Sequence, residues 1–519
     1  MAVMTQKVRD ITHIGAYSRC DTCFMRLKRL SVYALGAIGF MVGATHAALP
    51  LESVQSAVAE SGYVEQVRDD ISPAQEEAMW NEIRRGVATL RAQGMLATTD
   101  VALASQAITY AFPLRMAPGL PDYGGFRVSA FVDHNAAAGL SQVLDYNGGT
   151  RTYDGHHGTD YALWPFGWNK LNAGEVQAIA AAAGTIINRV NDDPTDHNPC
   201  DGGSSNDPWN YVALLHADGR LSIYGHMRYN SLSTKGIGQT VAQGEYLGTA
   251  ASSGNSSGPH LHFEMRYGSF SNAEWIDPYA GPNSQPGSLW ANQRPYIDSA
   301  INKISTHSAQ PIDINCQPST TNLQDNFTTP ATIRFYIHYR DYQGALPTEG
   351  RIYRPDGTVF QSWSVTDANT FLSAAKNSWT FDFLASEPAG TWRFEATYSG
   401  QTYQTFFNLN SPTSITVLGS NSDSRLDPRK SHAVTWADNL GGDVNITLYR
   451  NGMYQATLAS NVPSNGQFMW KPDAALAQGS GYSIRVSSVV NPTVYGESST
   501  TFSLQTVPSL TPILMLLLD

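Results

Sequence analysis

The sequence predicts a mainly β protein of about three or four domains, preceded by a helical N-terminal segment. Its 519 residues exceed the size of one ordinary domain. Hydrophobic residues make up 42%, enough for packed cores, whereas charged residues make up only 15%. From Ile108 onward, short apolar runs are separated by Gly-rich turns. This balance is typical of β-rich extracellular modules rather than of a helical cytosolic enzyme.

Residues 1–47 have the features of a secretory signal peptide. The basic cluster Arg26–Arg29 precedes the apolar run Leu30–Ala44, and small residues follow, with cleavage expected after Ala47. Met25 directly precedes the basic cluster and is a candidate for the true start. A membrane anchor needs about 20 apolar residues, and this run has 15. We therefore expect a secreted, periplasmic or cell-envelope protein whose mature chain has no stable membrane span.

The charge of the mature chain argues against a nucleic-acid partner. Six of the 33 basic residues and two of the 44 acidic residues lie in the first 47, so the remainder holds 27 and 42, a net charge of −15. Such a chain has no bulk attraction for phosphate backbones. Only Cys200 and Cys316 remain after cleavage, and in an oxidising compartment they can form one disulfide, although the sequence alone does not determine their pairing.

Residues 48–107 are predicted to be helical. Apolar residues recur at helical spacing between Glu76 and Arg91, and Ser72-Pro73 is a typical helix start. A helix between a signal peptide and an enzyme domain is commonly part of a propeptide. A helix that docks permanently on the domain fits the same pattern.

Two histidine clusters lie in the segment from residue 108 to 281. The first is the run from Asp154 to Asp160, and the second is the run from Ser256 to Glu264. Alternate residues of a strand point to the same face, so His260 and His262 can enter one site, as can His156 and Asp160. Imidazoles and a carboxylate suit zinc, and three protein ligands leave a position open for water. The pattern therefore indicates a hydrolytic metal site.

The segment 108–281 resembles the lysostaphin/LytM-type zinc metalloendopeptidases, which are peptidoglycan hydrolases. The resemblance depends on motifs that follow one another in the family's order. They are His156-His157-Gly158-Thr159-Asp160, Tyr224-Gly225-His226-Met227, Val241-Ala242-Gln243-Gly244 with Leu247-Gly248, and Gly258-Pro259-His260-Leu261-His262-Phe263-Glu264. The resemblance implies an antiparallel β-sheet peptidase domain. The chain has no HExxH motif of the other common zinc peptidase layout.

The resemblance also implies roles for individual residues. His156, Asp160 and His262 would bind one Zn²⁺ per chain, and His226 and His260 would be catalytic. For four neighbouring residues the pattern leaves alternatives. His157 is interpreted as structural because adjacent strand residues point to opposite faces. Glu264 supports a ligand or is solvated, and Tyr153 and Tyr224 line the substrate groove or simply pack.

The sequence of the remainder of the chain predicts two β modules. Residues 282–326 are interpreted as a linker with a short helical piece near residues 296–304. Residues 327–411 and 412–507 each contain alternating apolar and polar runs, with turns at Pro355-Asp356-Gly357 and Asn451-Gly452. Each module has the size of an immunoglobulin-like β-sandwich. The apolar tail in 508–519 is too short to span a bilayer.

The sequence thus predicts a secreted zinc metalloendopeptidase that hydrolyses peptide bonds of bacterial peptidoglycan. A secreted peptidase acting on proteins or Gly-rich peptides would use the same site. An inactive regulator or scaffold of cell-wall hydrolases is a further alternative, although the chain keeps all five residues of the implied site. The two C-terminal modules either bind the cell surface or pack on the peptidase domain and stabilise it.

Overall fold

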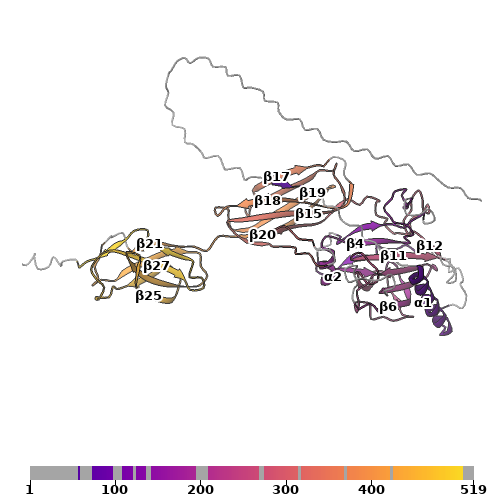
Figure 1. Ribbon diagram of the computed structural model, residues 1–519, viewed down its shortest axis with the longest axis horizontal. Coiled ribbons are helices and arrows are strands. Elements are labelled where there is room, and N and C mark those ends of the chain that lie inside the picture. Colours follow the sequence, from indigo (N-terminus) through magenta and orange to yellow (C-terminus); the bar gives the residue numbers. More distant parts are fainter. Residues whose placement is uncertain are drawn as a thin grey trace, which may run out of the picture. The chain divides into compact units, whose positions relative to one another are not determined.

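The computed structural model describes residues 56–58, 73–96, 108–120, 124–135, 142–194, 209–267, 274–313, 317–367, 371–420 and 425–506. The predicted signal peptide, the apolar tail and all four cysteines lie outside these ranges. Within them strands predominate and the helices number two, which confirms the predicted mainly β fold class (Figure 1). No helix in the described ranges is long and apolar enough to cross a membrane.

An antiparallel sheet of eight strands forms the peptidase-like segment, as predicted. A smaller sheet of three strands and the short helix α2 (Gly167–Ala173) complete this segment. The large sheet has the order β3 (Phe126–Ala130), β4 (Gly158–Leu163), β11 (His260–Tyr267), β8 (Leu221–Gly225), β7 (Tyr211–His216), β6 (Gly184–Val190) and β9 (Thr240–Val241), with β12 (Glu274–Trp275) beside β11. The small sheet has the order β10 (Tyr246–Thr249), β5 (Val176–Ile179) and β2 (Leu114–Met116).

One face of the large sheet packs in the hydrophobic core, and the other face carries the histidines. Along β11, Leu261 and Phe263 are fully buried in a core shared with the small sheet. His260 and His262 alternate with them and therefore point to the opposite face. The hydrophobic positions of β11 thus fix the orientation of both histidines, because a slip of one residue would bury the imidazoles in the core.

The helix α1 (Pro73–Ala92) covers part of the face that carries the histidines (Figure 1). This confirms the helix predicted between Glu76 and Arg91, whereas the prediction of helix for the whole of 48–107 is wrong at residues 56–58, which form the strand β1 (Ser56–Val58). At Gly86 the helix lies so close to β6 that an added Cβ would be 2.3 Å from the carbonyl oxygen of Ile187. The apolar stripe of α1 is buried against β6, β7 and β8, and its members are Met79, Trp80, Ile83, Val87 and Leu90. The close contact favours a helix that docks on the domain.

The first β-sandwich is built from two sheets around an aromatic core. One sheet has the order β1 (Ser56–Val58), β18 (Phe371–Phe383), β15 (Ala331–Gln343) and β13 (Ala300–His307). The other has the order β14 (Asn326–Thr328), β20 (Gln401–Asn410), β19 (Gly390–Tyr398), β16 (Thr348–Tyr353) and β17 (Val359–Val365). The predicted turn between β16 and β17 is present, with Gly357 at a φ of 83°.

The structure differs from the predicted linker 282–326 in two respects. The helical piece predicted near residues 296–304 is wrong, because β13 begins at Ala300 and pairs with β15. Its apolar residues Ile301 and Ile304 are buried in the sandwich core, which overrides any local helical preference. At the other end, Trp290 packs in the peptidase core and bridges to Tyr110. Both neighbouring domains therefore extend into the segment.

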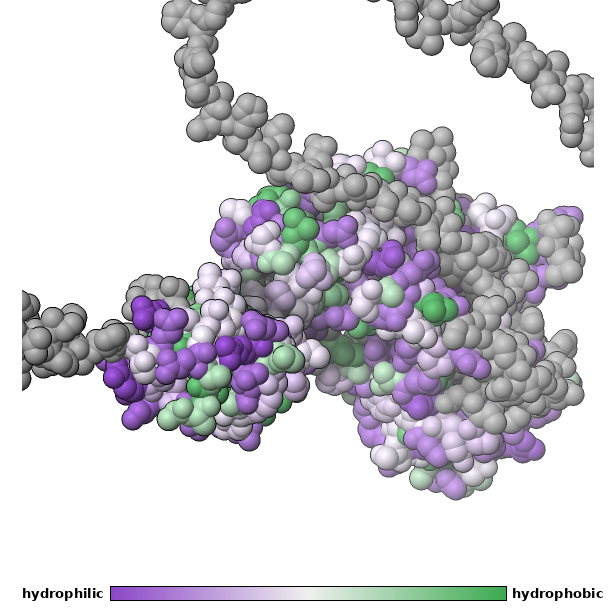
Figure 2. All heavy atoms as spheres, turned by 60° about the vertical axis from the view of Figure 1, so that its left-hand side comes forward, coloured by the Kyte–Doolittle hydropathy of each residue, from purple (hydrophilic) through white to green (hydrophobic). Residues whose placement is uncertain are grey.

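The second β-sandwich has its own hydrophobic core. One sheet has the order β21 (Ile415–Ser420), β23 (His432–Asp438) and β26 (Gln467–Trp470). The other has the order β22 (Arg425–Leu426), β29 (Phe502–Leu504), β27 (Gly479–Ser488), β24 (Asp443–Arg450) and β25 (Met453–Pro463), with β28 (Tyr495–Glu497) beside β27. The predicted hairpin at Asn451-Gly452 is confirmed, since both residues have positive φ and join β24 to β25. The surface visible in Figure 2 is mainly polar, with hydrophobic residues scattered among polar ones.

Candidate metal centre

The pairing of β4 with β11 brings the two histidine clusters together. Asp160 lies directly opposite His262 in this antiparallel ladder. The Nδ1 atom of His262 is 3.0 Å from Oδ1 of Asp160, and Nε2 of His156 is 3.2 Å from the same oxygen. All three side chains are buried. Residues about a hundred positions apart therefore form one cluster.

The donor set of this cluster fits a zinc ion. One ligand atom from each of His156, Asp160 and His262 lies within 4.8 Å of the other two. Two imidazole nitrogens and one carboxylate oxygen are the mixture that zinc takes in open, water-accepting sites. The predicted ligand residues are thus brought together, whereas the identity of the metal is a proposal developed below.

The orientation of His156 is set by a backbone carbonyl. Its Nδ1 lies 2.6 Å from the carbonyl oxygen of Phe131. A carbonyl only accepts, so Nδ1 carries the proton and Nε2 presents its lone pair to Asp160 and the metal position. Tyr153 packs flat on the imidazole at 4.3 Å between ring centroids and donates to Oδ2 of Asp160 at 3.3 Å. Tyr153 therefore lies beside the ligands, which places it within the site.

A series of charged side chains supports His262 on the Nε2 side of its ring. Its Nε2 lies 3.5 Å from a carboxylate oxygen of the buried Glu264, which also accepts from Arg266. Burial opposes ionisation of Glu264, but Arg266 and the His262 contact outweigh it and lower the pKa to about 2. Arg266 in turn pairs with Glu76 of α1 at 2.6 Å. Of the two alternatives for Glu264, support of a ligand is the one observed.

His226 and His260 lie side by side next to this cluster. Their ring centroids are 4.3 Å apart, and Nε2 of His260 is 3.7 Å from Oδ1 of Asp160. The Nδ1 atom of His226 donates to the carbonyl oxygen of Ser253 at 2.6 Å, and that of His260 donates to Gly258 at 2.8 Å. In each neutral ring the proton is therefore on Nδ1, and Nε2 keeps its lone pair, as a group that accepts a proton requires.

The loop between β10 and β11 holds both of these rings. It provides the two carbonyl acceptors, and its Ser256 hydroxyl lies 3.3 Å from Nδ1 of His260. The buried Asp193 braces the loop from outside by accepting from the backbone N–H of Gly254 at 2.7 Å. The backbone carbonyls of Ser253 and Gly258 in this loop thus orient the two histidines.

Trp209 is a site residue that the sequence did not reveal. Its ring centroid lies 5.2 Å from that of His226 and 5.8 Å from that of His262. The ring rests directly on Gly225, where an added Cβ would be 1.8 Å from the indole. The glycine of the Tyr-Gly-His motif is therefore needed for space, and His226 follows it at a φ of 56°. Gly225 was visible in the sequence as a position of close contact, but the sequence did not show that Trp209 makes this contact.

Two other predicted neighbours lie away from the ligands. Tyr224 is fully buried in the core and accepts the backbone N–H of Ala181 at 2.7 Å, so the groove-lining alternative is wrong. Phe263, which is paired with Tyr224 in the ladder between β8 and β11, faces the same core. His157 lies 3.6 Å from Glu76 and stacks on Trp275, in agreement with its structural interpretation.

Comparison with known proteins gives this segment a family. Residues 167–278 match the family model described as peptidase family M23. This segment is an M23 peptidase domain. The predicted resemblance to the LytM-type peptidases is confirmed. The matched range contains His226, His260 and His262, whereas His156 and Asp160 precede it and reach the site through the β4–β11 pairing.

Relatives match only parts of the chain. A cell division protein, DipM of Caulobacter vibrioides, is 43% identical over 58 residues, which are 11% of this chain and 9% of that protein. The chain thus spans a small part of this relative's length. The catalytic domain of EnpA, a prophage-encoded M23 protein from Enterococcus faecalis, is 23% identical and covers 33% of this chain and 98% of its own, with a TM-score of 0.21.

The C-terminal region matches immunoglobulin-like domains. Residues 420–504 fit the family model of the Kre9/KNH-like N-terminal Ig-like domain. Among solved structures, an amphioxus IgVJ-C2 molecule is 14% identical over 35% of this chain and 99% of its own, with a TM-score of 0.20. The predicted fold class, a β-sheet peptidase domain followed by immunoglobulin-like sandwiches, is confirmed.

Proposed function

We propose that this protein is a zinc metalloendopeptidase that is exported to the cell envelope or beyond and hydrolyses peptide bonds of bacterial peptidoglycan. The observation that carries the proposal is the buried set of His156, Asp160 and His262 with two further histidines beside it. A zinc ion held by these three residues would supply a Lewis acid that activates water and polarises the scissile carbonyl.

The remaining residues of the site would handle protons. With Nδ1–H committed to a carbonyl, Nε2 of His226 or His260 can take the proton of the attacking water. Once protonated, the same ring becomes a donor on both nitrogens and can pass a proton to the leaving amine or stabilise the oxyanion. Carbonyl bonds at Ser253 and Gly258 keep both rings in place through this cycle.

Purified sacculi provide the direct test of substrate and chemistry. We expect digestion to release peptides with new amino termini, detected by mass spectrometry, and we expect a chelator to stop it and added zinc to restore it. Purified protein should contain about one zinc per chain. If only proteins or free Gly-rich peptides are cut, the secreted-peptidase alternative replaces this one. Absence of cleavage on every substrate by zinc-loaded protein would favour an inactive regulator.

The ligand assignment is tested by His262→Ala. We expect loss of the bound zinc and of activity, because two remaining ligands hold zinc far more weakly than three. His157→Ala is the matched control, since His157 directly follows His156 in the sequence but contacts Glu76 rather than the ligands. Full zinc content in His262→Ala would rule out the ligand assignment.

Removal of the N-terminal segment is a separate proposal. If residues 48–107 are a propeptide, the mature protein should begin near residue 105 and be more active than the longer form. The burial of α1 against the sheet and the pairing of Glu76 with Arg266 support retention of the helix instead. Amino-terminal sequencing of active protein from the culture or periplasm separates the two outcomes.

A further inference from the structure

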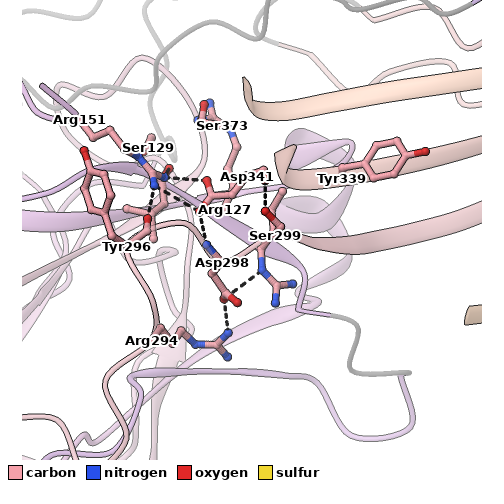
Figure 3. Close-up of polar contacts among 12 residues, drawn as sticks. Arg127, Ser129, Arg151, Arg294, Tyr296, Asp298, Ser299, Tyr339, Asp341 and Ser373 are labelled. Carbon is pink, nitrogen blue, oxygen red and sulfur yellow. Dashed lines mark hydrogen bonds and ion pairs between the residues drawn. The ribbon is translucent and has the colours of Figure 1, made fainter. Parts of the chain in front are cut away.

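A cluster of charged side chains joins the first sandwich to the peptidase domain. Arg127 and Arg151 come from the peptidase domain, whereas Asp341 and Ser373 come from the sandwich, and the four lie together in Figure 3. Arg151 binds Asp341 in a two-pronged manner, at 2.7 Å through Nη2 and 3.2 Å through Nη1. The side chains of Arg151 and Asp341 are 11% and 4% exposed, and Arg127 beside them is 1% exposed. A fork-like pair shielded from water is a strong and directional contact.

Asp341 is held in position for this contact. Its φ of 44° lies in the left-handed region, which aspartate tolerates better than most residues. Oδ2 of Asp341 accepts the backbone N–H of Asp298 at 2.9 Å, and the carbonyl oxygen accepts from the hydroxyl of Ser299 at 2.6 Å. These hydrogen bonds within the sandwich hold Asp341 in the position in which its carboxylate binds Arg151.

The contact leads from Arg151 to a proposed zinc ligand in two steps. The backbone carbonyl of Arg151 accepts the N–H of Phe131 at 2.7 Å. The carbonyl of Phe131 in turn accepts from Thr152 and from Nδ1 of His156, each at 2.6 Å. The acceptor that selects the tautomer and direction of His156 is therefore held by the residue that Asp341 clamps.

The neighbouring strand provides a parallel connection. Arg127 and Ser129 lie on β3, the strand next to β4, and the Ser129 hydroxyl donates to the carbonyl oxygen of Asp160 at 3.3 Å. Arg127 donates to the hydroxyl of Ser373 at 3.2 Å. Burial, with Arg151 nearby, lowers the pKa of Arg127 to about 10. The sandwich therefore also fixes the strand that borders the ligand Asp160.

Neutral contacts also join the two domains at this interface. Trp164, just after β4, donates through its indole N–H to the carbonyl of Tyr339 at 2.9 Å. Asn302 donates to the carbonyl of Phe126 at 2.6 Å. The ring of Phe166 lies 5.1 Å from that of the buried His338. These contacts exclude water around the charged cluster and strengthen it.

We propose that Asp341 is a positioning residue of the peptidase, which makes the first sandwich an integral part of the metal centre. The inference rests on the proposed zinc site. The clamp on Arg151 keeps Phe131 and His156 aligned for metal binding, so its loss should weaken zinc binding in addition to any loss of stability. Partners that orient metal-bound histidines change metal affinity by about 10–100-fold.

The test compares Asp341→Asn with Asp382→Asn in the full chain. Asp382 is the control because it lies on β18 of the same sheet and its carboxylate accepts a hydrogen bond from the exposed Thr332 hydroxyl, within the sandwich. Zinc affinity is measured by competition with a chromophoric chelator, stability by thermal unfolding of zinc-free protein, and kcat and KM on a soluble peptide. We expect about tenfold weaker zinc binding and lower kcat at nearly unchanged KM for Asp341→Asn only.

Several outcomes separate the possible roles. If Asp341→Asn lowers the melting temperature but leaves zinc affinity and kcat as in the wild type, the positioning role is wrong and the residue is only structural. If Asp341→Asn does not fold, Arg151→Lys gives the same test, since it keeps the charge and loses the fork. If the wild type itself binds no zinc, the proposed function fails and this inference fails with it, whereas equal zinc affinity of the wild type and Asp341→Asn overturns only the inference.

A double variant tests whether the two residues act through each other. Arg151→Met keeps the aliphatic part of the side chain and removes the guanidinium. We expect Arg151→Met combined with Asp341→Asn to bind zinc no more weakly than the worse single variant. Additive losses would show that the residues act independently and would overturn the proposed clamp.

Discussion

The two sandwiches have the same architecture, but their charged side chains make different contacts. In the first, Asp341 is buried and binds Arg151 of the peptidase domain. In the second, Arg485 pairs with Glu497 on the neighbouring strand of its own sheet, and about a third of each side chain is exposed. A buried charge whose partner lies in another domain makes the two domains interdependent, because separation leaves both charges without compensation. A solvated pair within one sheet has no such consequence.

The largest expected difference between the sandwiches is in truncated chains. A chain that ends at residue 411 should keep the melting temperature of the peptidase domain and its turnover of a soluble peptide. A chain that ends at residue 298 should lose both, since it exposes the buried surface around Arg127 and Trp164. Thermal unfolding and peptide cleavage measure the two effects. Equal behaviour of the two truncations would contradict the comparison.

Activity of the shorter chain on sacculi then distinguishes roles of the second sandwich. If this module binds the cell surface, the chain ending at 411 should cut sacculi more slowly than the full chain and cut soluble peptide at the same rate. Attachment raises the effective concentration of enzyme at a polymer without a new catalytic contact. Equal rates on both substrates would remove the surface-binding proposal.

A variant that affects only the proposed proton transfer provides the reference for the variants that act through the first sandwich. His226→Ala should lower kcat by at least ~10²-fold, the usual scale for a proton-transfer group. Zinc content and melting temperature should stay near those of the wild type, since His226 is outside the ligand set. Loss of rate without loss of stability would separate this variant from any that acts through the first sandwich. Near-normal turnover would rule out the proposed catalytic role.

Acid should affect the first sandwich more than the second. Burial, with Lys303 nearby, lowers the pKa of His307 from 6.5 to about 4, and burial lowers that of His338 well below its ordinary value. The charged groups that act on His338 are all basic, namely His307, Lys303, Lys376 and Lys170. The unfolded chain therefore takes up protons first as the pH falls below about 6.5.

The lowered pKa values of His307 and His338 determine the direction in which pH changes the stability of the first sandwich. Stability should be constant above pH 6.5 and decrease as the pH falls toward 4, by on the order of 3 kcal/mol for His307. Chemical unfolding followed at pH 7, 5.5 and 4.5 measures the loss, and the variant His307→Gln should reduce it. A pH dependence that is identical in this variant would show that other groups are responsible.

The smallest effect is expected in the second sandwich. Arg485→Gln removes the pair with Glu497 and the contacts with the rings of Tyr449 and Tyr495. Because these groups are partly exposed, the free energy of unfolding should fall by about 1 kcal/mol or less. Zinc affinity and peptide turnover should be unchanged. A change in either would mean that the second sandwich also reaches the metal centre.

The sequence by itself determined the composition of the site and much of the architecture. The alternation of Leu261 and Phe263 with His260 and His262 sets which side of β11 is buried, and this period holds in any packed sheet. The helical stripe of α1 and the hairpin at Asn451-Gly452 were predictable for the same reason, since local periodicity and turn geometry depend on neighbouring residues. The family resemblance supplied the roles of these residues.

The tertiary structure alone decided what surrounds and supports the site. Trp209, Phe131 and Asp341 reach it through contacts between residues far apart in sequence, which no local pattern records. For the same reason, Ala300–His307 forms a strand within the predicted linker, because its partner β15 and the sandwich core outweigh local preference. Long-range packing, rather than the motif residues themselves, connects the first sandwich to the metal centre.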